Sequence, residues 1–216
     1  MPEFNLIQKI IIWAPPVLFA ITLHEVAHGW VANRLGDPTA RMLGRLTVNP
    51  LKHIDPLGTV IIPALLFFTT GFVFGWAKPV PVSPRNFRNP RKGMAIVALA
   101  GPVANLCMGI AWAALAWVVA LFNRPSLAPL FYMGIAGVSV NVVLMILNLL
   151  PVPPLDGGRV LAGVLSSSAA RLMDRIEPYG LFIIAALMLT HLLDYLLGPP
   201  IYWLQSLLLS PLTGLS

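Results

Sequence analysis

Charged residues are scarce in this sequence: Asp, Glu, Lys and Arg make up only 10% of its 216 residues, whereas 57% are hydrophobic. About a quarter of the residues of a soluble domain are usually charged, so this composition excludes an ordinary soluble domain. Several apolar runs approach the ~20 residues that a helix needs to cross the hydrocarbon core of a bilayer. The composition therefore predicts an integral membrane protein embedded in the lipid bilayer.

Cysteine is almost absent: Cys107 is the only one, which excludes an internal disulfide and leaves the redox compartment open. The sequence also lacks internal repeats and low-complexity tracts. Its net charge of +6 comes from basic residues in short loops between the apolar runs. Membrane topology explains such loops better than a nucleic-acid partner does, so we expect no nucleic-acid binding.

Apolar segments divide the chain, and we expect them at Ile7–Val31, Thr59–Trp76, Met94–Phe122, Leu130–Leu150 and Tyr179–Leu197. A short apolar tail follows from Pro199. Together they predict an all-α, polytopic helix bundle of five to six apolar segments, forming a single domain over residues 1–216. Residues 41–49 (RMLGRLTVN) have the strand-like character of a run bounded by glycine and proline. The alternative for this short region is an ordinary connecting loop.

The first apolar segment contains two histidines and a glutamate in the stretch HEVAH. On a helix, residues four apart share a face, so His24 and His28 can direct their imidazoles at one ion. Glu25 lies about 100° further round the helix, where its carboxylate can reach a metal-bound water without ligating the metal. Zinc hydrolases pair two histidine ligands with a carboxylate base in this way. The alternative is a buried polar cluster, but ionisable groups at membrane depth are costly and usually functional.

A catalytic zinc site needs a third protein ligand, with water in the fourth position. Asp156 is the strongest candidate, because it follows the fourth apolar segment in NLLPVPPLDGG, where prolines end the helix and glycines free the backbone to turn. We interpret His191 and Asp194 as a partnered polar pair and His53 and Asp55 as solvated loop residues. The remaining candidate ligands are Glu3, Asp37, Asp174 and Glu177.

Three motifs of this sequence resemble the site-2 protease family of intramembrane zinc metalloproteases. They are HEVAH at His24–His28, AGPVAN with Gly101–Asn105, and NLLPVPPLDGG with Asn148, Pro151, Asp156 and Gly157. The family is marked by HExxH, a Gly-x-x-x-Asn-like motif and Asn-x-x-Pro-x-x-x-x-Asp-Gly, and the sequence departs from none of them at these core positions. The resemblance covers about residues 20–165. GRLTVNPLKHIDPLG and FGWAKPVPV look like the compact branch of the family without PDZ or CBS domains.

The resemblance implies a zinc metalloendopeptidase that cleaves transmembrane protein or peptide substrates within or near their spans, as in regulated intramembrane proteolysis. It implies one zinc ion with three protein ligands, His24, His28 and Asp156. It also implies Glu25 as general acid and base, and Asn148 as the residue that orients substrate or stabilises the oxyanion. The catalytic core would occupy about residues 7–165, followed by helices at 179–212. A helical substrate must unwind before attack, and the strand-like region could hold its extended segment by β-addition.

Membrane topology gives an independent test of this metal site. For one ion to bind both the first segment and Asp156, the two must lie at the same side of the membrane, so one intervening segment should not cross. Thr59–Trp76 contains Pro63 and two glycines, and we expect it to be re-entrant, as is tolerated where backbone lines protein or a water-filled cavity.

Loop charges favour the same arrangement. A re-entrant Thr59–Trp76 leaves only Lys9 and Arg124 on one side, whereas a crossing segment would split the 14 basic residues 9 to 5. The residues gathered on the other side are Arg34, Arg41, Arg45, Lys52, Lys78, Arg85, Arg88, Arg91, Lys92, Arg159, Arg171 and Arg175. By the positive-inside rule the active site then opens to the cytoplasm, and we expect a prokaryotic cell (inner) membrane.

Two other functions are compatible with intramembrane histidines and carboxylates. A metal or proton transporter also uses such residues, although transport needs no HExxH base and no inverted repeat is visible. An inactive relative could serve as an interaction scaffold for membrane proteins, although here the set of ligands and base is intact. Glu25→Gln separates the first alternative from a protease, because a protease would lose turnover and keep its zinc.

Overall fold

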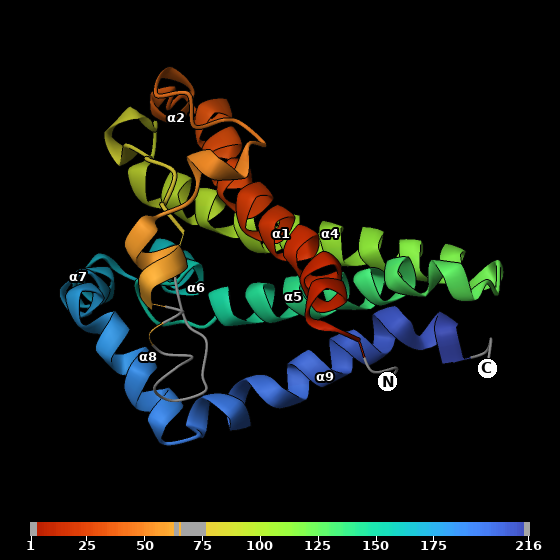
Figure 1. The fold of residues 1–216 in the computed structure, drawn as a ribbon. Coiled ribbons are helices and arrows are strands. Elements are labelled where there is room, and N and C mark those ends of the chain that lie inside the picture. Colours follow the sequence, from red (N-terminus) through yellow and green to blue (C-terminus); the bar gives the residue numbers. More distant parts are fainter. Residues whose placement is uncertain (1–3, 63–64, 66–76, 214–216) are drawn as a thin grey trace.

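The computed structural model describes residues 4–62, 65 and 77–213, which form an assembly of helices (Figure 1). The long helices are α1 (Leu6–Arg34), α4 (Pro90–Leu121), α5 (Ala128–Asn148) and α9 (Leu192–Thr213). The shorter ones are α2 (Thr39–Met42), α6 (Asp156–Val164), α7 (Ser167–Ile176) and α8 (Gly180–Leu189). Single turns lie at η1 (Pro50–Lys52), η2 (Pro56–Ile61), η3 (Pro84–Asn86), η4 (Pro125–Leu127) and η5 (Glu177–Tyr179).

Helices α4 and α5 form an antiparallel hairpin that is closed by η4, and α1 crosses both of them (Figure 1). Small residues allow the close approach: a Cβ added at Gly134 of α5 would lie 2.8 Å from the Cβ of Ala116 in α4. Close packing of this kind through small residues is typical of membrane helices. The hairpin is therefore the structural support on which α1 and α6 are placed.

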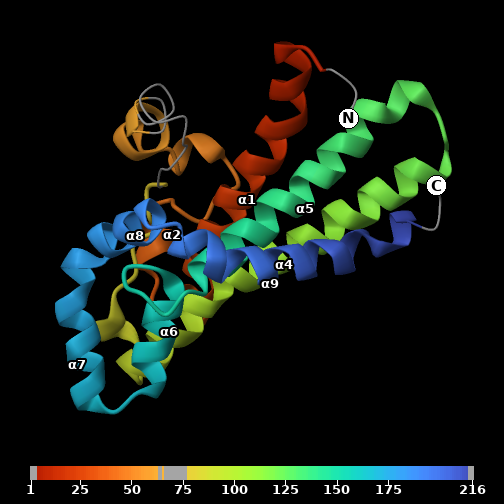
Figure 2. The ribbon, with the colours of Figure 1, turned by 90° about the horizontal axis from the view of Figure 1, so that it is seen from below.

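Helix α9 lies along α5 and extends the assembly on that side (Figure 2). Its Leu204 packs against Val138 and Val142 of α5, and these three residues form a buried apolar cluster. Apolar burial of this kind favours association in water, but within a bilayer helices associate chiefly by close packing. The C-terminal helix thus packs against both helices of the α4–α5 hairpin.

Three helices are long and apolar enough to cross a membrane: Leu6–Arg34, Pro90–Leu121 and Pro125–Asn148. They confirm the predicted spans at 7–31, 94–122 and 130–150. A fourth is possible if the bent pair Ser167–Leu189 and Leu192–Leu212 counts as one span. The described residues thus provide three or four such spans, and the predicted five to six are not reached. Most of the predicted segment at 59–76 lies outside the described residues.

The fifth predicted span, Tyr179–Leu197, is wrong as a single helix. It is divided at Thr190 and His191 into α8 and α9. The helical stretches before and after this break, Ser167–Leu189 and Leu192–Leu212, meet at a bend of 83°. Thr190 Oγ1 donates to the carbonyl oxygens of Ala186 and Leu187, and His191 adopts a φ of 56°, so the α8 ladder stops there. Conversely, α9 continues through Pro199 and Pro200, where we expected the helix to end.

The predicted strand near residues 41–49 is also wrong. Residues 39–42 form α2, and residues 43–49 carry neither helix nor strand. Gly44 has a φ of +63°, and Arg45 N donates back to Ala40 O at 2.9 Å, so the backbone folds on itself and does not extend. A strand needs a partner for its ladder, and here the neighbouring carbonyl of Lys78 accepts from the Arg45 side chain. The substrate-holding edge that we expected from this region is therefore not formed.

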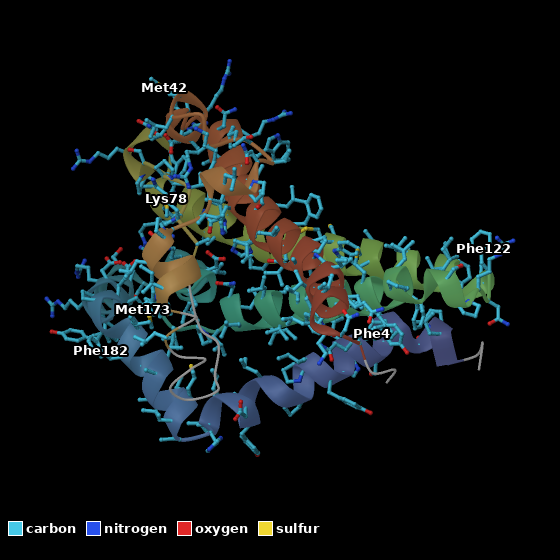
Figure 3. All side chains as sticks on the ribbon, viewed as in Figure 1. Phe4, Met42, Lys78, Phe122, Met173 and Phe182 are labelled. Carbon is cyan, nitrogen blue, oxygen red and sulfur yellow. The ribbon has the colours of Figure 1, made fainter. Side chains whose placement is uncertain are left out.

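Polar and basic loops gather at one end of the α4–α5 hairpin. Figure 3 shows Met42 and Lys78 at this end and Phe122 at the opposite end, where the hairpin turns. The ends of α1 and α5 that carry HEVAH and NLLPVPPLDGG point toward the loop-rich end (Figure 1). The fold thus brings these two motifs together from distant parts of the chain.

Candidate metal centre

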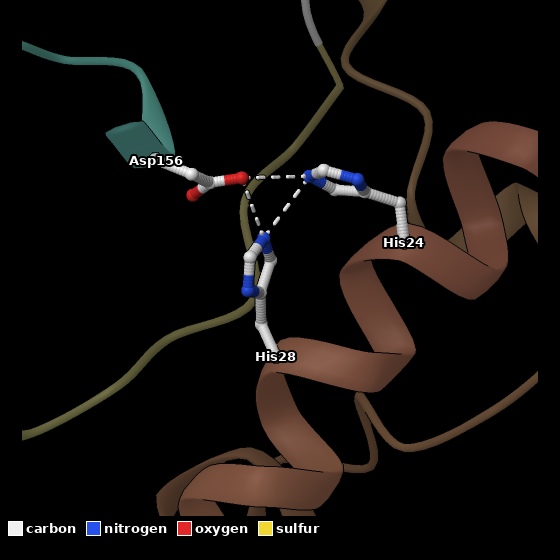
Figure 4. Close-up of side chains that lie close together, drawn as sticks. All are labelled: His24, His28 and Asp156. Atoms are coloured by element: carbon white, nitrogen blue, oxygen red, sulfur yellow. Dashed lines mark hydrogen bonds and ion pairs between the residues drawn. The ribbon is translucent and has the colours of Figure 1, made fainter. Parts of the chain in front are cut away.

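Three side chains meet between α1 and the start of α6: His24, His28 and Asp156 (Figure 4). His24 Nε2 lies 3.2 Å from Asp156 Oδ2, and His28 Nε2 lies 3.3 Å from the same oxygen. The two Nε2 atoms are 3.0 Å apart. All three residues are buried, and within the described part of the chain no other group of three metal-ligating side chains converges.

The outer nitrogen of each imidazole determines its tautomer. His24 Nδ1 lies 2.6 Å from Asn105 Oδ1, and His28 Nδ1 lies 2.7 Å from the carbonyl oxygen of Val97. Both partners are hydrogen-bond acceptors, so each Nδ1 must carry the proton and donate it. In neutral imidazoles of this tautomer the two Nε2 atoms turn unprotonated lone pairs toward Asp156, as metal-ligating histidines do.

The centre of the cluster contains acceptors only. With both imidazoles neutral and protonated at Nδ1, no proton lies between the two Nε2 atoms, and Asp156 Oδ2 is buried without a hydrogen-bond partner. Three lone pairs facing one another are unfavourable unless a cation lies among them. Tetrahedral zinc with ligands near 2.0–2.1 Å would separate its ligand atoms by about 3.3 Å, close to the 3.0–3.3 Å observed. The donor set fits a metal ion without rearrangement.

A chain of amides behind His24 fixes the orientation of its imidazole. Asn105 Nδ2 donates to Asn141 Oδ1 at 2.9 Å, and Asn141 Nδ2 donates to the carbonyl oxygen of Gly137 at 2.8 Å. Asn105 and Asn141 are completely buried. Because every donor in the chain points the same way, Asn105 is left with its oxygen toward His24. The partners behind a metal ligand tune its orientation in the same manner.

Two glycines leave the space in which the ligands meet. A Cβ at Gly101 would lie 2.5 Å from His24 Cε1 and from His28 Nε2, so only glycine allows α4 to approach both rings. A Cβ at Gly157, directly after Asp156, would overlap the carbonyl oxygens at the end of α5. Both residues belong to the motifs from which the site was predicted: Gly101 leaves room for the two imidazoles, and Gly157 leaves room for the neighbouring backbone.

Glu25 lies next to the cluster on α1 and is half-buried. Its Oε2 accepts a hydrogen bond of 2.7 Å from the backbone N–H of Val80. Asn148, at the end of α5, is half-buried and donates from Nδ2 to the carbonyl oxygen of Leu144 at 2.9 Å. Glu25 thus has a partner from a distant segment, whereas Asn148 bonds to its own helix.

The other candidate ligands lie away from the cluster. His53 is buried and bonds through Nε2 to the carbonyl oxygen of Thr47 at 2.9 Å, so it is not the solvated loop residue that we expected. Asp55 accepts from the amides of Leu57 and Gly58 at the start of η2. The remaining described candidates do not belong to the cluster: Asp37, Asp174, Glu177, His191 and Asp194. Glu3 lies outside the described residues.

Sequence reasoning missed Asn141 and Val80. Asn141 could have been found as an isolated amide within the apolar α5, seven residues before Asn148. Val80 carries no such signal, because it acts through its backbone amide. Asn105 was recognised as part of a motif, but its contact with His24 depends on how α4 crosses α1.

The apolar helices and the buried histidine–carboxylate cluster together define an integral membrane protein with a candidate metal centre. Residues 123–191 match peptidase family M50. Bacillus subtilis YwhC, whose name describes it as a candidate zinc metalloprotease, is 38% identical over 85% of this chain and 82% of its own length. Rip2 of Mycolicibacterium smegmatis, similarly named, is 32% identical over 86% of this chain and 70% of its own length. No solved structure matches the chain.

The chain belongs to peptidase family M50, the site-2 protease family. The resemblance stated from its three motifs is confirmed. The matched part of the family pattern contains Asn148 and Asp156, and the similarity to YwhC extends over most of the chain.

Proposed function

We propose that this protein is a zinc metalloendopeptidase that hydrolyses peptide bonds within or near the transmembrane segments of membrane protein substrates. The observation that supports it best is the convergence of two imidazole lone pairs and one carboxylate oxygen within 3.0–3.3 Å in a member of family M50. His24, His28 and Asp156 are the proposed ligands of a single zinc ion. Three protein ligands with one open position are typical of catalytic zinc and not of structural zinc.

When bound, zinc would lower the pKa of a water molecule toward about 7 and polarise the scissile carbonyl. Glu25 is the proposed general base and acid: it accepts a proton from the attacking water and returns it to the leaving amine. The water oxygen bonds to the carbonyl carbon, and the C–N bond breaks as the amine receives the proton. Asn148 is proposed to orient the substrate or to donate to the developing oxyanion.

We propose that the site opens toward the cytoplasm. His53 O accepts from Lys78 N at 2.9 Å, so residues before and after the predicted re-entrant segment are in contact. The contacts of His24 and His28 with Asp156 support an arrangement in which the end of α1 and the start of α6 lie at the same side of the membrane. The positive-inside rule then places this side in the cytoplasm.

The test uses the purified full chain in detergent and a fluorogenic single-span peptide with glycines in the middle of its helix. We expect about one zinc ion per chain by elemental analysis and cleavage that depends on Glu25. Glu25→Gln should retain zinc and lose turnover. Wild-type protein that binds no divalent metal would contradict the proposal, as would equal cleavage by wild type and Glu25→Gln. Zinc or proton flux into proteoliposomes that survives in Glu25→Gln would instead identify a transporter.

A further inference from the structure

Residues 78–83 (KPVPVS) form a non-helical segment, here called the 78–83 strip, that lies against α1 beside the candidate metal centre. Arg45 anchors its first end: Nη2 donates to the carbonyl oxygen of Lys78 at 2.8 Å and to that of Pro79 at 3.4 Å. Lys78 N also donates to His53 O. The beginning of the strip is therefore attached to the loop that follows α2.

Asp37 anchors the other end of the strip. Its Oδ2 accepts from Ser83 N at 2.6 Å, and its Oδ1 accepts from Asn86 Nδ2 at 2.6 Å and from the Thr39 hydroxyl at 2.5 Å. The side chain of Asp37 is completely buried. A buried carboxylate is tolerated when several donors surround it. Here one donor, Ser83 N, belongs to the strip, and another, Asn86 Nδ2, belongs to η3 directly after it.

The middle of the strip contacts α1 at two residues of one helix face. Glu25 Oε2 accepts from Val80 N, and a Cβ added at Gly29 would lie 2.7 Å from Val80 Cγ1. Residues 25 and 29 are four apart and share a face. Val80 thus places its side chain over Gly29 and its amide on Glu25. Because Pro79 and Pro81 have no N–H, Val80 supplies the only backbone donor at this point of the strip.

We propose that Val80 is a positioning residue for Glu25: its amide fixes one carboxylate oxygen and leaves the other for proton transfer. Asp37 and Arg45 act one step further away by holding the 78–83 strip in register. This inference rests on the proposed function, since it assigns a task to the catalytic base. Misplacement of a catalytic group by about 1 Å can cost about 100-fold in rate. We therefore expect loss of the Val80 donor to lower kcat by about 10- to 100-fold.

The test compares three variants of the 78–83 strip. Val80→Pro removes the amide donor, Val80→Ala keeps the donor and shortens the side chain, and Val82→Pro makes the same backbone change two residues away. We expect a reduced kcat only for Val80→Pro, with KM within about twofold of wild type and zinc content unchanged.

Two measurements keep the inference testable if Val80→Pro folds poorly. Gly29→Ala introduces a Cβ that would lie 2.6 Å from Leu46 Cδ2 and 2.7 Å from Val80 Cγ1, so both side chains must shift. A lower kcat with unchanged KM and zinc content supports the proposal. Hydrogen–deuterium exchange requires no substrate: the Val80 amide should exchange faster in Glu25→Ala than in wild type, whereas the Val82 amide should not change.

Several results would overturn the inference while leaving the proposed function intact. They are equal kcat for Val80→Pro and Val82→Pro, a change confined to KM, loss of zinc in Val80→Pro, or unchanged exchange of Val80 in Glu25→Ala. Failure of the proposed function has a different signature, because wild type and Glu25→Gln would then behave alike before any change is made in the strip.

Discussion

Two histidine–aspartate contacts in this molecule have nearly the same length and opposite surroundings. His24 and Asp156 approach to 3.2 Å with side chains that are 10% and 9% exposed. His191 and Asp194 approach to 3.1 Å with side chains that are 87% and 79% exposed. The distance alone therefore does not distinguish a candidate metal centre from a surface pair.

The difference lies in which nitrogen faces the carboxylate and in what fixes the ring. In the exposed pair, Nδ1 of His191 itself contacts an aspartate three residues away: His191 lies in the bend before α9, and Asp194 lies in the first turn of α9. In the buried cluster, Nδ1 of His24 is occupied by Asn105, and Nε2 is directed inward at residues from a distant part of the chain. The partners behind the rings, and not the contact distance, thus distinguish the candidate metal centre from the surface pair.

Removal of Asp156 should have the largest effect on the candidate metal centre. In Asp156→Ala the cluster keeps two imidazoles and loses its only anion, so zinc content should fall below one tenth of the wild-type value and cleavage should be undetectable. Elemental analysis and the fluorogenic assay measure the two effects. Asp174→Ala, in the exposed part of α7, is the control and should match wild type. Full zinc occupancy in Asp156→Ala would remove this residue from the ligand set.

Gly101→Ala should have the next largest effect. The new Cβ would lie 2.5 Å from atoms of both imidazoles, so the rings or helix α4 must move. We expect at least tenfold weaker zinc binding in competition with a chelator. Gly109→Ala in the same helix is a matched control, because its Cβ would meet its nearest neighbours at 3.7 Å. Similar zinc affinities for the two variants would show that the approach of α4 does not shape the site.

The amide chain should contribute less, and its effect should decrease with distance from the metal. Asn105→Leu removes the acceptor of His24 Nδ1, and we expect a 10- to 100-fold loss of zinc affinity, the usual cost of losing a partner behind a ligand. Asn141→Leu acts one hydrogen bond further from the metal and should lower zinc affinity by less than tenfold. A larger loss in Asn141→Leu than in Asn105→Leu would mean that α5 packing, and not imidazole orientation, dominates.

The fold could be predicted from the sequence where long apolar runs determine helices by themselves. The spans at α1, α4 and α5 were correct because a helix is the only way to satisfy so many backbone groups in an apolar setting. The break at Thr190 and His191 was missed because two polar residues do not interrupt a hydropathy average. The strand at 41–49 was wrong because its extension depended on a partner that the fold does not supply.

The site could be predicted where spacing within one helix or a chain break is sufficient. His24 and His28 share a helix face, and the prolines before Asp156 explain its position at a helix start. Assignment of Glu25 and Asn148 to catalysis stays a prediction. The contacts of Asn141 and Val80 were not accessible, because both depend on how segments separated by dozens of residues cross.

Asp37 is a third case beside the two histidine–aspartate contacts, because it is a buried aspartate without a histidine partner. Burial alone would raise its pKa, but hydrogen bonds from Thr39, Ser83 and Asn86 lower the pKa below the ordinary value of 3.8. A lowered folded-state pKa means that the stabilisation by charged Asp37 is present above about pH 4 and is lost as the pH falls further.

Thermal unfolding between pH 7 and pH 3 measures this contribution. The difference in midpoint between wild type and Asp37→Asn should be constant down to about pH 4 and should shrink below it. Zinc content at pH 7 should not change, because Asp37 is no part of the cluster. A difference that is independent of pH down to pH 3 would mean that Asp37 contributes through hydrogen bonding alone.

The smallest effect is expected at the exposed pair. An ion pair between solvent-exposed side chains contributes between nothing and about 1 kcal/mol, and salt screens it further. His191→Asn removes the imidazole and retains a residue that tolerates the φ of 56°, so the bend between α8 and α9 should persist. We expect unchanged zinc content, unchanged kcat and a midpoint of unfolding within about 1 °C of wild type. Lower zinc occupancy in His191→Asn would show that metal reaches the surface pair, and burial would then no longer separate the two histidine–aspartate contacts.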